Sequence, residues 1–367
     1  MVSRVAIVLL ILTSVSPAIA AGGLRGPHTS KSFFNPSLGQ SVSFAVTLPW
    51  PGKLSAAVLD RDGYIIRSLL RPQESPAGET TLMWNGRDDQ GAVVPDEAYS
   101  FKIDLVSGTR HWTYFPAGHA PTMPQSVAIR SFDPRTGVLS YELPAPSRVH
   151  IQAGSAVLAG DGKPDGPVLK TVVDEQPRIG GSVIEQWNGL DESGTIYVPD
   201  QPHFVMSLVT APLPDNSIIT VGNRARTFLE YVAHRHGTSL VASHAAHAHH
   251  AGLQAVDDVA PPLQLTVANG VWSGTDKAWR GTEAVRLVAE LEGPIAARFA
   301  KHSAEVEVFV DGKRVLTRKA ELPRIAIVLP PVTAPGPHIV AFNWIGRNGP
   351  VAVNSLRLLI PPHVTAR

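Results

Sequence analysis

The chain has 367 residues, with 32 Lys and Arg against 31 Asp and Glu, a formal net charge of +1. This balance does not favour a nucleic-acid partner, and the absence of cysteine excludes disulfides and thiolate metal ligands. The 31 Gly and 32 Pro, with 44% hydrophobic residues, indicate short strands joined by turns rather than long helices. We therefore expect an all-β protein whose core holds without covalent cross-links.

The first twenty residues have the pattern of a secretory signal peptide. Arg4 precedes the apolar run VAIVLLIL, and small residues at Ala18 and Ala20 end the segment. The run is shorter than the roughly 20 residues that a membrane-spanning helix needs, and no later stretch is long and uncharged enough. Cleavage would remove one basic residue and leave 31 basic against 31 acidic ones (32 − 1 = 31). We expect residues 1–20 to be removed and the mature protein to be exported to the periplasm or cell surface, without a transmembrane segment.

Residues 30–108 predict a first β-sandwich. Runs with alternating apolar and polar side chains, such as SVSFAVTL and YSFKIDLV, are separated by turn residues at the intervals typical of a sandwich. Asp-Gly and Asn-Gly pairs lie between the runs and tolerate the positive φ that tight hairpin turns require.

A repeat predicts a second sandwich over residues 127–222. The string WNGRDDQGAVVPDEAY, from residue 84, returns in similar form as WNGLDESGTIYVPDQPHF, from residue 187, and the segments before each copy also match. Ca²⁺ chelation by the carboxylates is the weaker interpretation of this string, because no loop supplies the six or more oxygens that the ion prefers. We expect structural roles instead, with tryptophans in the core, glycines allowing the turn and carboxylates accepting N–H groups, for Trp84, Gly86, Asp88, Trp187, Gly189 and Asp191.

These residues resemble the Ig-like domain of the flagellar hook-cap protein family, the FlgD-type fold. The matching positions in the first copy are Phe34, Pro36, Gly63, Arg67, Leu69, Trp84, Gly86, Asp88, Gly91, Pro95 and Tyr99. In the second copy they are Phe132, Pro134, Leu169, Trp187, Gly189, Asp191, Gly194, Pro199 and Phe204. The resemblance covers roughly residues 30–222 and implies two tandem Ig-like or fibronectin-like sandwiches. Such modules are attached to many exported bacterial proteins as spacers or interaction domains, and the expected signal peptide argues against a hook cap itself.

Residues 262–361 lack the Trp-Asn-Gly string but show the alternation of a third sandwich, similar to a bacterial Ig-like domain. Within it, VWSGTDKAWRG places Trp272 and Trp279 in an expected loop. Exposed tryptophans there would stack on a sugar or anchor a protein partner. The other interpretation is that one or both close the end of the sandwich.

Residues 223–261 are expected to form a His- and Ala-rich linker between the second and third sandwiches. Six of the 14 histidines lie there: His234, His236, His244, His247, His249 and His250. In a helix three of them would share one face, and imidazoles suit Zn²⁺, Cu²⁺ or Ni²⁺. Two further interpretations stay open, a low-complexity linker without a specific role for its histidines and a hinge whose imidazoles charge together near about pH 6.

No catalytic signature stands out, since the sequence has no His-Glu-x-x-His, no Gly-x-Ser-x-Gly and no Gly-rich phosphate loop with its lysine. We therefore expect a non-enzymatic, exported scaffold or interaction protein, whose partners are other exported proteins of a periplasmic or surface assembly. The alternatives are a periplasmic Zn- or Cu-binding protein acting through the His-rich segment, and a carbohydrate-binding accessory module.

Overall fold

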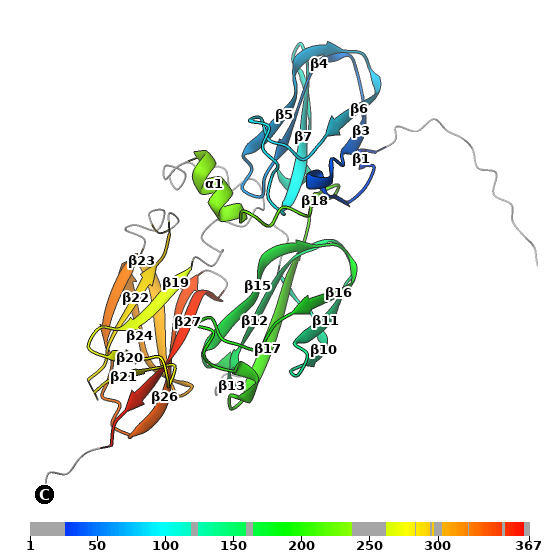
Figure 1. The fold of residues 1–367 in the computed structure, drawn as a ribbon. Helices are drawn as coiled ribbons and strands as arrows, with labels where there is room; N and C mark the ends of the chain where they lie inside the picture. The colour runs from blue at the N-terminus through cyan, green and yellow to red at the C-terminus, as the bar shows by residue number, and fades with distance from the viewer. Residues whose placement is uncertain are drawn as a thin grey trace, which may run out of the picture.

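A computed structural model shows a chain built almost wholly of β-strands and arranged as three β-sandwiches (Figure 1). It describes residues 26–118, 124–158, 164–236, 262–282, 284–293, 296, 303–321, 323–346 and 349–362. The expected signal peptide lies outside these residues. The predicted fold class, all-β with sandwich architecture, is confirmed. In the part of the chain that the structure describes, no helix is long and apolar enough to cross a membrane.

The first sandwich packs a three-stranded sheet against a six-stranded one. The small sheet has the order β1 (His28–Thr29), β3 (Val42–Leu48), β6 (Gly78–Trp84). The large sheet contains β2 (Phe33–Phe34), β18 (Ile218–Thr220), β7 (Ala98–Ser107), β4 (Gly52–Leu59) and β5 (Ile65–Ser75), with β8 (Arg110–Tyr114) also paired to β7. Short 3₁₀ turns cover Pro36–Leu38 and Pro116–Gly118. Every second residue of β3 is buried, which is the period of a strand with one face on a core.

Two segments that follow the second sandwich in sequence complete the first. Strand β18 pairs antiparallel with β7 and parallel with β2. Helix α1 (Phe228–His236) inserts Phe228, Tyr231 and Val232 into the first core. The second sandwich is therefore inserted into the first, between β8 and β18.

The structure differs here from the predicted boundaries, which ended the second domain at residue 222 and began a linker without a core at residue 223. The three residues of β18 are too few to show an alternation that would assign them, and proximity in sequence placed them with the preceding domain. Helix α1 lies within the segment expected to be a linker, yet its buried side chains belong to the first core. Residues 237–261 of that segment lie outside the described residues.

The second sandwich repeats the central strand pairings of the first but not its edge strands. One sheet is β10 (Ile129–Asp133), β11 (Val138–Leu143), β16 (Gly181–Gln186), and the other is β15 (Val168–Arg178), β12 (Ser147–Ser155), β17 (Phe204–Pro212), β9 (Gln125–Ser126). A small hairpin, β13 (Val157–Leu158) with β14 (Pro164–Asp165), and a 3₁₀ turn at Val198–Asp200 are added. Strands β5 and β15 each begin with a bulge, at which Ile66 and Leu169 are the extra residues.

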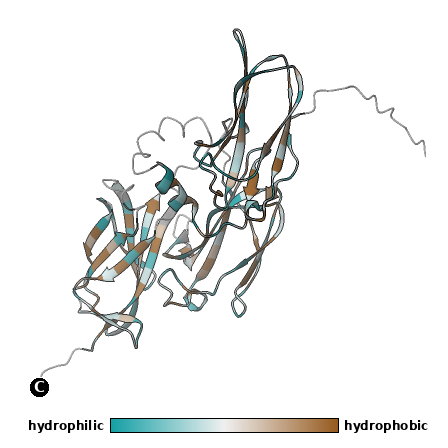
Figure 2. Cartoon of the chain, turned by 45° about the horizontal axis from the view of Figure 1, so that its top comes forward, coloured by the Kyte–Doolittle hydropathy of each residue, from teal (hydrophilic) through white to brown (hydrophobic). Residues whose placement is uncertain are grey.

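The third sandwich packs against the second. Its sheets are β19 (Leu263–Val267), β22 (Arg286–Leu291), β25 (Arg324–Val328), and β20 (Val271–Ser273), β21 (Ala278–Arg280), β27 (Gly349–Ile360), β26 (Gly336–Gly346), β23 (Ser303–Val310), β24 (Lys313–Glu321). Hydrophobic and hydrophilic residues alternate along its strands (Figure 2). Phe309 and Ala341 of this sandwich share a buried cluster with Leu169 and Trp187 of the second, and Arg314 forms an ion pair with Asp165. The two sandwiches are therefore joined by apolar and charged contacts.

A buried carboxylate joins the first and second sandwiches. Glu97, only 2% exposed, accepts a hydrogen bond from Nη1 of Arg148 at 2.6 Å through Oε1. Its other oxygen, Oε2, lies 3.3 Å from Nη1 of Arg61. Arg148 belongs to β12 of the inserted sandwich, whereas Arg61 and Glu97 belong to the first. Because a buried ion pair loses its hydration, each charge depends on keeping its partner in place.

Trp84→Ala should lower the free energy of unfolding by about 3–5 kcal/mol, because it removes a large aromatic side chain from the first core. Urea unfolding of the full chain measures the change. The control is Met83→Ala on the same strand, whose side chain is 59% exposed and whose loss should change stability by no more than about 0.5 kcal/mol. Equal effects of the two substitutions would contradict the burial argument.

Glu97→Gln should destabilise the chain by about 3–5 kcal/mol, since it removes the negative charge that both buried guanidinium groups contact directly. Small-angle scattering should also show a wider range of angles between the first two sandwiches. The matched control is Glu142→Gln, which breaks an exposed pair with Arg130 and should cost at most about 1 kcal/mol. A Glu97→Gln protein with unchanged stability and scattering would refute this role.

Candidate functional site

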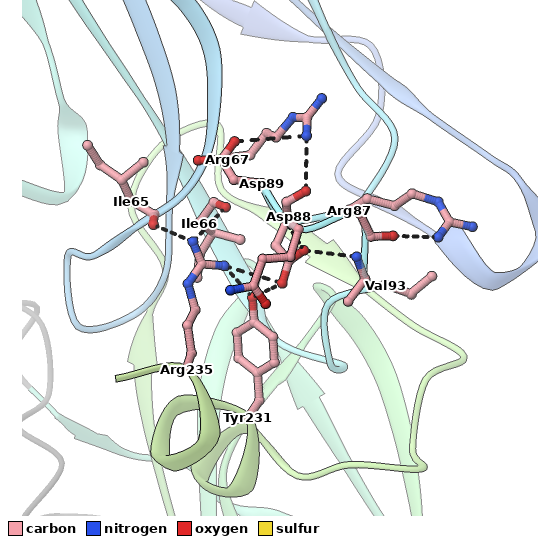
Figure 3. Close-up of polar contacts among 12 residues, drawn as sticks. Ile65, Ile66, Arg67, Arg87, Asp88, Asp89, Val93, Tyr231 and Arg235 are labelled. Carbon is pink, nitrogen blue, oxygen red and sulfur yellow. Dashed lines mark hydrogen bonds and ion pairs between the residues drawn. The ribbon is translucent and has the colours of Figure 1, made fainter. Parts of the chain in front are cut away.

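The Trp-Asn-Gly turn of the first sandwich is a closed, hydrogen-bonded loop between β6 and β7 (Figure 3). Trp84 is buried, and its Nε1 donates to the carbonyl of Arg87 at 3.0 Å. Oδ1 of Asp88 accepts the backbone N–H groups of Gln90 and Ala92, at 3.0 and 2.9 Å. One carboxylate oxygen of Asp88 is thus used to close the turn and to fix the orientation of the carboxylate.

The second copy is built in the same way. Nε1 of Trp187 donates to the carbonyl of Leu190 at 2.9 Å, and Oδ1 of Asp191 accepts the N–H groups of Thr195 and Ile196, both at 2.9 Å. Gly189, like Gly86 in the first copy, has a positive φ. A Cβ atom at Gly189 would lie 2.2 Å from a ring carbon of Tyr197. The tryptophan and the aspartate therefore make equivalent hydrogen bonds in both turns, and the glycine of each turn has a positive φ.

The second oxygen of Asp88 points out of the turn toward α1. Oδ2 accepts a hydrogen bond from the hydroxyl of Tyr231 at 2.9 Å and lies 3.3 Å from Nη1 of Arg235. Burial raises the pKa of Tyr231, so its hydroxyl keeps its proton and donates to the carboxylate. Asp88 is 1% exposed, so Tyr231 supplies a hydrogen bond and Arg235 the opposite charge to a carboxylate that water does not reach.

Two backbone carbonyls complete the contact with α1. Nη2 of Arg235 donates to the carbonyls of Ile65 and Ile66, each at 3.0 Å (Figure 3). Consecutive carbonyls of a regular strand point in opposite directions, whereas the bulge at Ile66 re-aims the backbone and brings both to one guanidinium. We refer to Oδ2 of Asp88 and these two carbonyls as the acceptor site of the first sandwich.

The equivalent groups of the second sandwich bind the third sandwich instead of a helix. Oδ2 of Asp191 accepts a hydrogen bond from the hydroxyl of Ser355, on β27, at 2.6 Å. Val168, at the bulge of β15, exchanges two hydrogen bonds with the side chain of Asn343, on β26, of 3.0 Å and 2.7 Å. Asn343 and Ser355 are both buried. The repeated turn and bulge therefore attach two unrelated elements, a helix in one copy and a sandwich in the other.

The structure places only part of the predicted His cluster. His234 is exposed on α1, and His236 is the last residue of that helix. His244, His247, His249 and His250 lie outside the described residues. Among the residues that are described, no group of three or more His, Cys, Asp or Glu side chains could hold a metal ion.

The tryptophan pair of the third sandwich lies on strands rather than in the expected loop. Trp272 on β20 faces Trp279 on β21 as its cross-strand partner, and their ring centroids are 5.8 Å apart. Trp279 packs against the third core, while Trp272 is 46% exposed. The turn between them holds Asp276, whose carboxylate is paired with Arg280 at 2.6 Å. One tryptophan is thus largely structural and the other is accessible.

Comparison with known proteins identifies one part of the chain. A family model, the FlgD Ig-like domain, matches residues 34–109. The basal-body rod modification protein FlgD of Salmonella typhimurium and that of Salmonella typhi are each 33% identical over 69 residues, which is 18% of this chain and 29% of the relative. The chain thus spans less than a third of the length of these curated relatives. Residues 34–109 form an Ig-like domain.

Solved structures with partial similarity include a tetra-tandem repeat from the extending region of a large adhesion protein and α2-macroglobulin from Escherichia coli. The first is 12% identical, with 91% of this chain and 73% of the other covered, at a TM-score of 0.19. The second is 10% identical, with 94% and 24% covered, also at a TM-score of 0.19. At such TM-scores the similarity supports no argument about this chain.

Four residues of these contacts had no part in the sequence-based prediction: Tyr231, Arg235, Asn343 and Ser355. Tyr231 and Arg235 stand four positions apart, which brings their side chains together on one helix face, and this was the available signal. Nothing in the strand patterns around Asn343 and Ser355 distinguishes them, because their role arises from packing between sandwiches.

Asp88→Asn should destabilise more than Asp191→Asn. Asp88 accepts a hydrogen bond from Tyr231 and pairs with the guanidinium of Arg235, which can only donate, so an amide in its place loses a charge-assisted interaction of about 1.5–3 kcal/mol. Asp191 faces the hydroxyls of Ser193 and Ser355, which can rotate to accept from the amide, so its loss should be about 1 kcal/mol or less. Urea unfolding with hydrogen exchange over residues 228–236 measures both effects, and the reverse order of stabilities would refute the assignment.

Proposed function

We propose that this chain is a non-catalytic, exported scaffold or interaction protein that holds Ig-like modules in a fixed arrangement within a periplasmic or cell-surface assembly. The observation that carries the proposal is the repeated use of one turn. In both copies a carboxylate oxygen closes the turn and the other oxygen holds a segment that is distant in sequence, which is α1 of the same module in the first copy and β27 of the third sandwich in the second. Groups that are used to hold the fold and to join modules serve an architectural role.

The second and third sandwiches belong to this proposal as further Ig-like modules. For residues 127–222, the matched central strand pairings, the bulge at the same place and the equivalent Trp-Asn-Gly turn support a second copy of the FlgD-type module, without β18. For residues 262–361, the two facing sheets support an Ig-like module of another type. The first module would then consist of residues 30–118 together with the segment from β18 through α1.

The proposed export of the protein and the proposed class of its partners are supported by two different observations. The sequence of residues 1–20 supports secretion, and the similarity of residues 34–109 to a FlgD Ig-like domain supports a role in protein interaction. The partners would be other exported proteins. The kind of domain present supports the non-enzymatic assignment.

The proposal predicts that a C-terminally tagged full chain, produced in the source bacterium, is recovered outside the cytoplasm with its N-terminus at Ala21. Chemical cross-linking in intact cells should join it to a small, reproducible set of exported proteins, identified by mass spectrometry. An unrelated exported Ig-like protein with the same tag is the control. Retention in the cytoplasm with an intact N-terminus, or cross-links identical to those of the control, would overturn it.

A further inference from the structure

We propose that the contact between the first and second sandwiches is linked to protonation: two negatively charged faces meet there, and protons bound at the contact hold the two modules together more firmly as the pH falls. We refer to this contact as the first joint. The first sandwich contributes Asp60, Arg61, Asp62 and Glu97 to it, and the second sandwich contributes Arg148, His150, Asp174 and Glu175.

The two faces lie close enough for their charges to interact. Nη1 of Arg148 donates to Oε1 of Glu97 at 2.6 Å and to the carbonyl of Glu175 at 3.1 Å, so one guanidinium bridges the two sandwiches. Burial opposes the charge of Arg61, yet carboxylates of both sandwiches raise its pKa, Glu97 most strongly and Glu175 among the others. Charges on one face therefore act directly on groups of the other.

Negative charge is in excess on both faces when all carboxyl groups of the first joint are ionised and its imidazole is neutral. The first sandwich brings three carboxylates against one guanidinium (−3 + 1 = −2), and the second brings two against one (−2 + 1 = −1). The four charged residues of the first face are each no more than 5% exposed, so water screens their repulsion poorly. One proton on each face would leave a single negative charge opposite a neutral face.

Asp60 is the group that takes up a proton on the first face. It lies in the turn between β4 and β5, where its Oδ1 accepts the N–H groups of Asp62 and Tyr64, at 3.0 and 2.9 Å. Oδ2 is also buried, and among the residues that the structure describes no donor lies within hydrogen-bonding distance of it. An ionised oxygen in such surroundings is costly, and a proton on it removes the charge.

The groups around Asp60 favour its neutral form. Burial raises the pKa of Asp60 well above its ordinary value, and the charges of Asp62 and Glu97 raise it further. The two backbone N–H groups of the turn act in the opposite direction without cancelling the rise. Tyr99, on β7, lies near Asp60 and stays uncharged, because burial raises the pKa of its hydroxyl as well.

His150 is the group that takes up a proton on the second face. Its Nδ1 lies 3.6 Å from Oδ1 of Asp174 and 3.5 Å from Oε1 of Glu175, on the paired strand β15. Burial by itself lowers the pKa of this imidazole, but the contact with Asp174 and the charge of Glu175 outweigh it, so the pKa of His150 is raised. Gln152 adds an uncharged hydrogen bond, and the neighbour on β17 is the apolar Val209.

Both pKa shifts have the same sign, so they act on the first joint in the same direction. A group whose pKa is higher in the folded state stabilises that state below its unfolded pKa and loses this effect as the pH rises through its folded pKa. For Asp60 the loss begins above about pH 4, and for His150 above about pH 6.5. The first joint is therefore held most firmly in mild acid and loosens as the pH rises.

Asp60→Asn tests the proton on the buried carboxyl group. The amide oxygen still accepts the N–H groups of the turn, and the charge is removed. The melting temperature of the full-length variant minus that of the wild type should increase by at least about 3 °C between about pH 5.5 and about pH 8.5. The control is Asp104→Asn, which removes a partly exposed carboxylate paired with Lys102 and whose effect should be the same at both pH values. A difference for Asp60→Asn that does not change with pH would overturn the inference.

Two spin labels test the first joint itself, because the chain has no cysteine of its own. Glu79→Cys and Ser182→Cys place one label at an exposed position on each of the first two sandwiches. The distribution of distances between the labels should be wider at about pH 8.5 than at about pH 5.5, and Asp60→Asn should narrow it at the higher pH.

Equal widths at the two pH values would overturn the proton-linked joint, whatever the melting temperatures show, because the first sandwich alone would then hold the proton. If Asp60→Asn fails to fold by circular dichroism, the labelled chain with Asp60 in place decides the question. Both results leave the scaffold proposal as it stands, since cross-linking in cells tests that proposal independently.

Discussion

The arrangement of this protein depends on a buried carboxylate in a turn. An ionised aspartate away from water is tolerated only when donors surround it, and in each Trp-Asn-Gly turn the donors come from two sources. Backbone N–H groups inside the turn satisfy one oxygen. The other oxygen remains to be satisfied by a different part of the chain, so burial of the charge and docking of that part occur together. The cost of burying an unpaired charge thus favours docking of α1 on the first sandwich and of the third sandwich on the second.

Insertion of the second sandwich into the first also restricts how these two modules are placed relative to each other. The chain crosses between the first and second sandwiches twice, once after β8 and once before β18, and Glu97 links Arg61 and Arg148 across the junction. Two covalent crossings and a desolvated ion network restrict rotation more than a single linker would. On the other side, the second sandwich shares buried apolar side chains with the third. The second sandwich consequently contacts both of its neighbours through buried surfaces.

Much of the fold could be predicted from the sequence because its signals are local. Alternating side chains and turn residues indicated sandwiches, and the repeated Trp-Asn-Gly string located two turns whose tryptophans the structure places in the core. The segments that the sequence did not reveal depend on distant parts of the chain. The three residues of β18 become a strand only because β7 and β2 offer free edges, and α1 becomes a helix on an apolar surface far away in sequence. The bulges at Ile66 and Leu169 likewise depend on strand register, which single-sequence patterns do not contain.

The insertion also determines how tension would pass through the molecule. Both ends of the second sandwich are attached to the first, so a stretching force along the chain enters the first sandwich at its N-terminal strands and leaves it through α1. That force passes through the hydrogen bonds and packing of the first sandwich and bypasses the backbone of the second for as long as the first one is folded. The inserted module is then loaded only through its non-covalent contacts, and its own strands are pulled apart only after β18 has left the sheet. Extension would therefore occur in an ordered series of steps. The inserted sandwich would unfold after the first one and would add its chain length only then.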